Sequence, residues 1–170
     1  PWGLRYERTG PGWLTGILRE GGGLKDGGEV VDLALERFGE IGQMSAVFRI
    51  RPTYSHAANG PACLVLKTTA PEMKNRVMNA TFGVFETEIN SYRLPQPPNG
   101  LLRPRCWYAA QHPLTKSAML VFDDLSGLRG VPEYSKLSSD DALRVVTAVA
   151  EHHAHWWKPA GQRGATLQQM

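Results

Sequence analysis

The chain has 170 residues, a formal net charge of +3 at pH 7 and 42% apolar residues. This composition is ordinary for a globular protein with one core. The basic residues are scattered, and no basic stripe with interleaved aromatic residues points to nucleic acid. No run approaches the roughly eighteen apolar residues of a membrane-spanning helix, and the N-terminus lacks a secretory pattern. We therefore expect neither a nucleic acid nor a membrane among the partners.

The elements of the first half follow from periodicity. Residues 1–28 are rich in glycine and are interpreted as an N-terminal extension with one short helix over 13–20. Five apolar residues predict a first strand over 30–38. Residues 46–51 alternate between apolar and polar and predict a second strand. Residues 62–68 are almost continuously apolar, so we expect a third strand that is buried on both faces.

Two helices and two strands are expected next. Pro71 suits the first turn of a helix, which predicts a helix over 72–79. A second helix is predicted over 84–94, because the prolines that follow it forbid continuation. Fourth and fifth strands are predicted over 104–110 and 118–122.

The clearest element lies near the C-terminus. After a linker over 123–137, Ser138 and Asp141 have the spacing of a capping box at the start of a helix over 138–158. Residues of this helix recur at steps of three and four and define one face: Leu143, Val146, Ala150, His153 and Trp157. Residues 159–170 are polar and are expected to be disordered.

Lys67 and Glu88 are the candidates for chemistry. Glu88 shares a helix face with Phe85 and Tyr92, which should point at the sheet. A carboxylate facing an interior is costly unless a cation meets it, and Lys67 on its strand has the opposite need. We therefore predict an ion pair. Glu86 lies about 200° round the helix and should face solvent. In the alternative interpretation, Glu88 is partly solvated and Lys67 is a strand-end charge.

A glycine loop between the first two strands is a second candidate site. Backbone N–H groups of a tight strand–turn–strand loop can approach phosphates. The residues that would form it are Gly39, Gly42, Gln43, Met44 and Ser45. A plain hairpin is the alternative.

A third candidate follows the fifth strand. After Phe122, the backbone groups of Asp123 and Leu125 could meet an adenine edge. An ordinary acidic turn is the alternative.

Histidines and cysteines do not predict a metal site. His152 and His153 differ by about 100° on the helix, and the adjacent tryptophans favour packing over zinc binding. Cys63 and Cys106 lie in apolar stretches without CxxC spacing, so we interpret both as buried free thiols. Free thiols are typical of a reducing cytosol, and we expect a cytoplasmic protein.

The ordered set of these motifs resembles a known family. The motifs are Gly42-Gln43-Met44-Ser45, Phe48-Arg49-Ile50 with Tyr54, Leu64-Val65-Leu66-Lys67, Phe85-Glu86-Thr87-Glu88 with Tyr92, Pro104-Arg105-Cys106-Trp107-Tyr108, Leu120-Val121-Phe122-Asp123-Asp124-Leu125 and His153-Ala154-His155-Trp156-Trp157. Together they resemble the ecdysteroid-kinase-like, or CHK kinase-like, small-molecule phosphotransferases, relatives of aminoglycoside phosphotransferases and choline kinases. The resemblance covers nearly the whole chain up to Trp157.

The resemblance implies a fold and an activity. The fold would be α+β: a protein-kinase-like N-terminal lobe over 29–122, with a five-stranded antiparallel sheet and inserted helices, then a hinge and the first helix of a C-terminal lobe. Lys67, paired with Glu88, would hold the phosphates of ATP under the loop at Gly42. Family members transfer the γ-phosphate, with Mg²⁺, to a hydroxyl of a small molecule.

Two departures from the family limit this expectation. Glu40 stands where relatives have a glycine, and it brings a like charge near the phosphates. The histidine-glycine-aspartate loop and the metal-binding aspartate expected after His153 do not occur before Met170, so no catalytic or metal residue is assigned. The chain also begins at Pro1 without a methionine. We expect a fragment or truncated product that does not turn over ATP and that self-associates through its last helix. The alternative, of another class, is a non-catalytic, pseudokinase-like interaction module with a degenerate nucleotide site.

Overall fold

The structure is a computed structural model that describes residues 9–25, 27–37, 45–55, 60–95, 101, 103–128, 130 and 135–157. The chain divides into two units. The first comprises Pro1–Leu94 and Pro104–Gly127, and the second comprises Pro95–Arg103 and Leu128–Met170. The first unit contains the sheet and three helices, and the second contains one helix.

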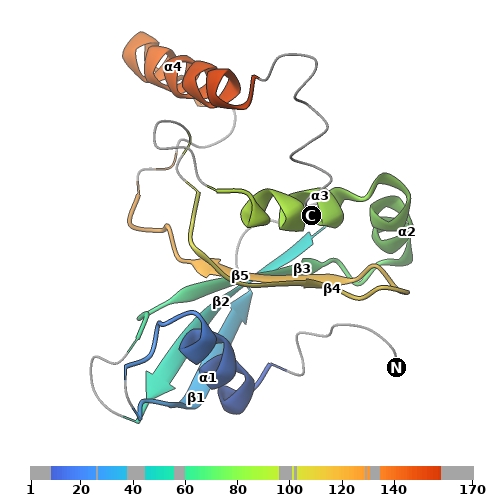
Figure 1. Cartoon of the computed structure of the whole chain (residues 1–170), viewed down its shortest axis with the longest axis vertical. Helices are drawn as coiled ribbons and strands as arrows, with labels where there is room; N and C mark the ends of the chain where they lie inside the picture. Colours follow the sequence, from blue (N-terminus) through green and yellow to red (C-terminus); the bar gives the residue numbers. More distant parts are fainter. Residues whose placement is uncertain are drawn as a thin grey trace. The chain divides into compact units, whose positions relative to one another are not determined.

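The first unit is built on an open sheet of five strands (Figure 1): β1 (Val30–Arg37), β2 (Ser45–Tyr54), β3 (Leu64–Thr69), β4 (Cys106–Gln111) and β5 (Ala118–Asp123). Their order is β1-β2-β3-β5-β4, and every neighbouring pair is antiparallel. The predicted α+β class with a five-stranded antiparallel sheet is thus confirmed. The strand positions also agree with the sequence, although β2 extends further than expected, to Tyr54.

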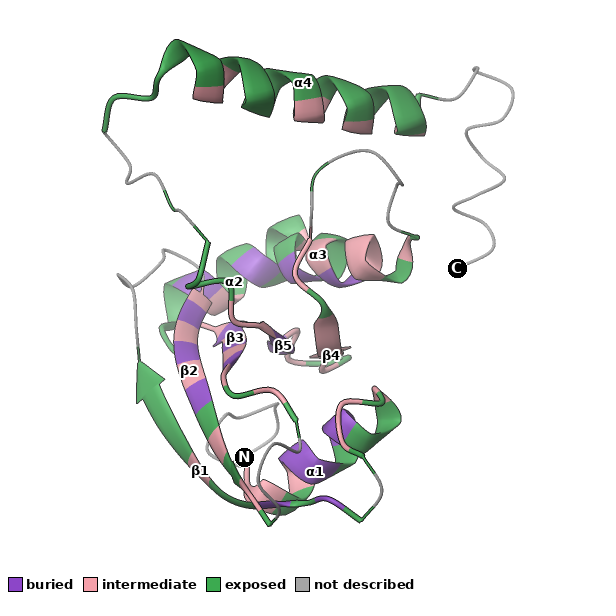
Figure 2. Cartoon of the chain, turned by 90° about the vertical axis from the view of Figure 1, so that its left-hand side faces the viewer, coloured by how far each residue is buried: buried purple, intermediate pink, exposed green. Residues whose placement is uncertain are grey.

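The two faces of the sheet differ in burial. Figure 2 shows buried and half-buried residues alternating along β2. In β3, Leu64 and Leu66 are fully buried, whereas Val65 and Lys67 are half-buried. The prediction that this strand is buried on both faces is therefore wrong for one face. Its apolar run includes Val65, but that face also carries a charged lysine, which remains within reach of water.

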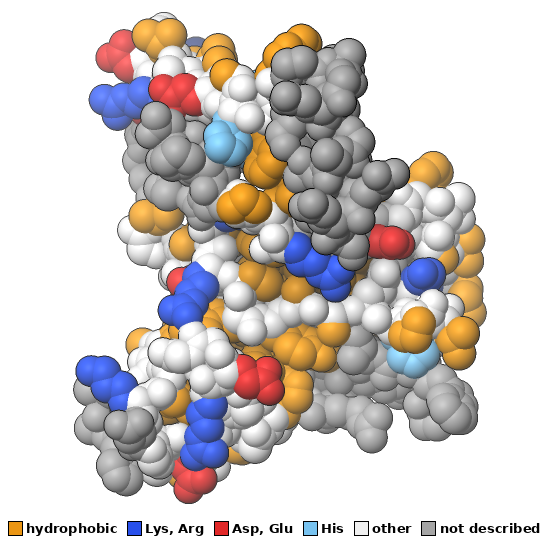
Figure 3. Space-filling view, viewed as in Figure 1, with side chains coloured by type: hydrophobic (Ala, Val, Ile, Leu, Met, Phe, Trp, Pro, Cys, Tyr) orange, Lys and Arg blue, Asp and Glu red, His pale blue; other side chains and the backbone are white. Residues whose placement is uncertain are grey.

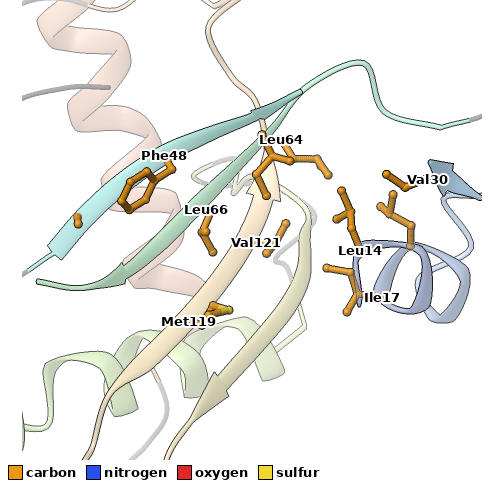
Figure 4. Close-up of a cluster of buried hydrophobic side chains, with 11 residues drawn as sticks. Leu14, Ile17, Val30, Phe48, Leu64, Leu66, Met119 and Val121 are labelled. Atoms are coloured by element: carbon orange, nitrogen blue, oxygen red, sulfur yellow. The ribbon is translucent and has the colours of Figure 1, made fainter. Parts of the chain in front are cut away.

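Helix α1 (Pro11–Glu20) covers the fully buried face. Its Leu14 and Leu18 are completely buried in a core cluster shared with β1, β2, β3 and β5 (Figure 4). The Thr15 hydroxyl donates to the Pro11 carbonyl and accepts from the Val30 N–H, each at 2.9 Å. Because this hydroxyl joins α1 to the first residue of β1, the helix and the sheet form one packed unit.

Two helices follow β3. They are α2 (Met73–Phe82) and α3 (Val84–Arg93), joined at Gly83, whose φ of +61° lies in the left-handed region that favours glycine. Both helices agree with the prediction. Helix α3 lies on the sheet face opposite α1 (Figure 1). There it forms a second core cluster, whose buried members are Phe85, Ile89, Ala118, Leu120 and Phe122.

The second unit contains α4 (Ser139–Trp156). Ser138 caps it: its hydroxyl accepts from the Asp141 N–H at 3.1 Å and donates to the Asp141 carboxylate at 2.8 Å, which confirms Ser138 as the N-cap of the predicted capping box. Leu143 and Trp157, on the predicted face, are 66% and 77% exposed. None of the helices within the described ranges has the length and apolar character needed to cross a membrane.

Removing one core contact of α1 should test this packing. We expect Leu18→Ala to lower the free energy of unfolding by about 2–5 kcal/mol, because a completely buried leucine leaves a cavity. Leu114→Ala, at a position that is 83% exposed, is the matched control and should cost less than about 0.5 kcal/mol. Chemical denaturation measures both, and equal losses would show that α1 does not pack on the sheet.

Candidate functional site

The ion pair between Lys67 and Glu88 is the centre of the site. The Lys67 Nζ lies 2.8 Å from both carboxylate oxygens of Glu88, and the two side chains are only 30% and 24% exposed. The same Nζ is 5.7 Å from the centre of the Phe85 ring. The predicted pair is confirmed, and Glu86 is exposed as expected. The carboxylate therefore fixes an ammonium group at the half-buried face of β3.

Asn79 positions the helix that carries Glu88. Its side chain is 1% exposed; its amide nitrogen donates to the Lys116 carbonyl at 2.6 Å, and its oxygen accepts from the Phe85 N–H at 3.1 Å. These two bonds tie the end of α2 and the start of α3 to the β4–β5 turn. Since Glu88 lies one turn beyond Phe85, they also set where its carboxylate reaches β3.

A cavity of about 300 Å³ opens where β5 ends. The residues that line it are Val65, Pro104, Phe122, Asp123, Asp124, Leu125 and Ser126. Val65 precedes Lys67 by two residues, so both side chains leave the same face of β3, about 6–7 Å apart along the strand. An apolar, flat group in this cavity could thus carry an anionic extension toward Lys67.

Hydrogen bonds fix the segment that borders the cavity. The Asp123 N–H donates to the Arg105 carbonyl at 3.0 Å, and the Asp123 carboxylate accepts from the indole N–H of Trp107 at 2.6 Å. Of the backbone N–H groups expected to meet an adenine edge, that of Asp123 is therefore already paired within the protein. Among the described residues, the Leu125 N–H has no acceptor. Leu125 therefore remains the donor for a ligand edge.

Asp124 forms a second ion pair that the sequence did not reveal. Its carboxylate lies 3.2 Å from the Arg49 Nε and accepts from the Ser126 N–H at 2.9 Å. Burial opposes ionisation, but the Ser126 N–H, the Cys63 thiol and the Arg49 charge outweigh it and hold the pKa of Asp124 below its usual value of 3.8. The partners are 75 residues apart. The sequence signal that could have indicated this ion pair is Arg49 itself, a charged residue of β2 that lies opposite Val65 of β3.

The glycine-loop prediction lies mostly outside the described residues. Gly39, Gly42, Gln43 and Met44 fall there, whereas Ser45 begins β2 and lies opposite Thr69. Two residues further, Val47 lies opposite Lys67. The chain therefore re-enters the sheet at the end of the ladder that is nearest to Lys67.

The other candidate groups do not form a reactive or metal-binding cluster. Among the described residues, no group of three or more His, Cys, Asp or Glu side chains could hold a metal ion. Cys63 and Cys106 are both free and half-buried. Burial raises the pKa of Cys106 to about 11, which makes it a poor nucleophile. The Trp156 ring packs 5.0 Å from that of His155.

Comparison of the chain with protein-family models, with curated proteins and with solved structures found no match.

Deleting the Asn79 amide should release α3. We expect Asn79→Ala to lower the free energy of unfolding by about 1–3 kcal/mol, because the buried Phe85 N–H loses its acceptor and the half-buried Lys116 carbonyl loses its shorter bond while retaining the one from Gln111 at 3.3 Å. Asn90→Ala is the control, since Asn90 bonds only the exposed Arg93 among the described residues. Denaturation curves compare the two variants. Similar losses would contradict the positioning role of Asn79.

The Asp124 ion pair should give stability a specific dependence on pH. Because the folded-state pKa of Asp124 is lowered, its stabilisation is present above about pH 4 and is lost as the pH falls through that lowered pKa. We expect Asp124→Asn to cost about 1–3 kcal/mol at pH 7, and the gap from the wild type to narrow below pH 4. The exposed Asp32→Asn serves as the control. A gap that stays constant across this range would contradict the assignment.

Proposed function

We propose that this chain is the ATP-binding lobe of a small-molecule kinase, of the CHK kinase-like type, which phosphorylates a hydroxyl of a small metabolite. One observation carries the proposal: the ammonium of Lys67 is held by Glu88 at 2.8 Å, on the same sheet face as the cavity at the end of β5. In kinases, a strand lysine held by a helix glutamate places its charge on the phosphates of the nucleotide.

The cavity and the ion pair together fit a nucleotide. The base would lie between Val65 and Leu125, with the Leu125 N–H and the Asp123 carbonyl facing its polar edge. The phosphates would extend along β3 toward Lys67, whose positive charge they share with Glu88. Bound ATP would supply the phosphoryl group. Only binding is proposed, because no residue of this sequence is assigned as a metal ligand or as a catalytic base.

A second candidate is the non-catalytic interaction module. Apolar side chains that helices usually bury are exposed here on both α2 and α4; Met73 is 70% exposed and Leu143 is 66% exposed. Nucleotide binding separates the two candidates, because an interaction module with a degenerate site needs no affinity for the phosphates.

Removal of the Lys67 charge tests the proposal. We expect Lys67→Ala to weaken ATP binding about tenfold and adenosine binding less than about twofold, because only ATP brings phosphates to the ammonium. Lys25→Ala, at an exposed lysine between α1 and β1, is the matched control and should change neither affinity. Isothermal titration calorimetry measures both ligands, and circular dichroism checks that each variant is folded.

Two outcomes would contradict the proposal: no binding of either ligand to the wild type, or equal losses of ATP and adenosine affinity in Lys67→Ala. The same samples test the expectation that this polypeptide does not turn over ATP. Magnesium-dependent turnover that disappears in Lys67→Ala would show that acidic residues of the chain, such as Asp123 or Asp124, do the chemistry.

A further inference from the structure

Helix α2 has its polarity inverted. The residues that it buries are Asn75 and Asn79, at 4% and 1% exposure. Met73, Val77 and Phe82 are 70%, 56% and 69% exposed. A helix on a globular protein normally buries its apolar face and turns its polar face to water. Asn79 bonds the start of α3 and the β4–β5 turn, and Asn75 bonds the N-cap residue Glu72, whereas the apolar side chains of α2 are left exposed.

The outward residues of α2 form a defined surface, the α2 stripe: Met73, Val77 and Ala80. At about 100° per residue they lie within an arc of roughly 60°. Lys74 flanks the stripe on one side and Arg76 on the other, and α2 contains no acidic residue. Figure 3 shows apolar side chains at the surface in the region that α2 occupies in Figure 1.

Helix α4 carries the complementary surface. Its outward residues form the α4 stripe: Leu143, Val146, Ala150, Ala154 and Trp157, all of them exposed. Asp140 and Glu151 flank this stripe on one side, at about 80–100° from its centre, and Arg144 lies slightly further round the helix, at about 120°. Lys74 and Glu151 each lack an ion-pair partner among the described residues.

We propose that the α2 stripe of one copy of this chain packs against the α4 stripe of a second copy. The charges favour an antiparallel arrangement. When each helix is viewed from its own N-terminus, Lys74 lies on the same side of its stripe as Asp140 and Glu151 do of theirs, and antiparallel packing brings these two sides together. Lys74 then faces the flank that bears Asp140 and Glu151. If Val77 inserts between Val146 and Ala150, Lys74 lies three residues away from Val77, at the level of Glu151.

The size of the surfaces makes the contact weak. Helix α2 has ten residues and α4 has eighteen, so only about half of α4 is covered by one α2. A contact between two short helices is smaller than a standard protein interface and produces a concentration-dependent association. Since each copy carries both surfaces, each copy offers two such contacts. The association requires no nucleotide, so it goes beyond the proposed function and can be tested independently of it.

Sedimentation equilibrium of the 170-residue chain over a concentration series, without nucleotide, tests this contact. We expect the wild type to associate, Val77→Asp to be a monomer, and Lys74→Glu and Glu151→Lys each to weaken association about fivefold. The double variant Lys74→Glu/Glu151→Lys should return to within about twofold of the wild type. Lys25→Glu is the charge-matched control and should associate as the wild type does. All four substituted positions are on the surface, and circular dichroism checks that each of the five variants is folded.

Association restored in the double variant supports the contact. If the two charge reversals acted at unrelated places, their losses of association would add in the double variant rather than cancel. A monomeric wild type at every concentration would overturn the proposal. Association that persists in Val77→Asp, or a double variant weaker than either single variant, would also overturn it. Binding of the wild type to anionic vesicles without self-association would assign the α2 stripe to a lipid surface instead.

Discussion

The salt bridge between Lys67 and Glu88 joins the strand and the helix on which the proposed nucleotide site depends. Lys67 comes from the half-buried face of β3, and Glu88 comes from the helix that covers part of that face. Neither charge is fully hydrated, so each requires the other. Phe85 packs beneath the ammonium and anchors α3 in the second core cluster, and Asn79 holds the start of α3. The position of one charge therefore depends on a chain of buried contacts.

The part of the site that borders the cavity at the end of β5 is fixed by different contacts. Asp123 is tied to β4 through the Trp107 indole and the Arg105 carbonyl. Asp124 is tied to β2 through Arg49. Adjacent carboxylates thus hold the end of β5 from both sides of the sheet. As a result, the carboxylates are occupied by structural bonds and the Leu125 N–H is left to a ligand. This division is physically consistent with a site that recognises its ligand through the backbone.

The sequence predicted the elements and the central pair but not the contacts between distant segments. Local periodicity was sufficient for the strands and helices, and helix geometry was sufficient to select Glu88 over Glu86. Pairs such as Arg49 with Asp124 depend on strand order, which no local pattern contains. The prediction that β3 is buried on both faces was wrong, because the apolar run did not show that the face with Lys67 stays partly exposed. The inverted polarity of α2 could not be predicted, because asparagine is usually an exposed residue and no local pattern shows that Asn75 and Asn79 are buried.

The side-chain ammonium resonance of Lys67 reports directly on whether this group meets the phosphates of ATP. NMR of the lysine ammonium groups, with Lys67 assigned through Lys67→Arg, would follow its signal during titrations with ATP and with adenosine. If the ammonium contacts the phosphates, its resonance shifts with ATP and stays in place with adenosine, while the resonance of the exposed Lys25 does not move. A Lys67 resonance that is unmoved by saturating ATP, or that shifts equally with adenosine, would contradict the account.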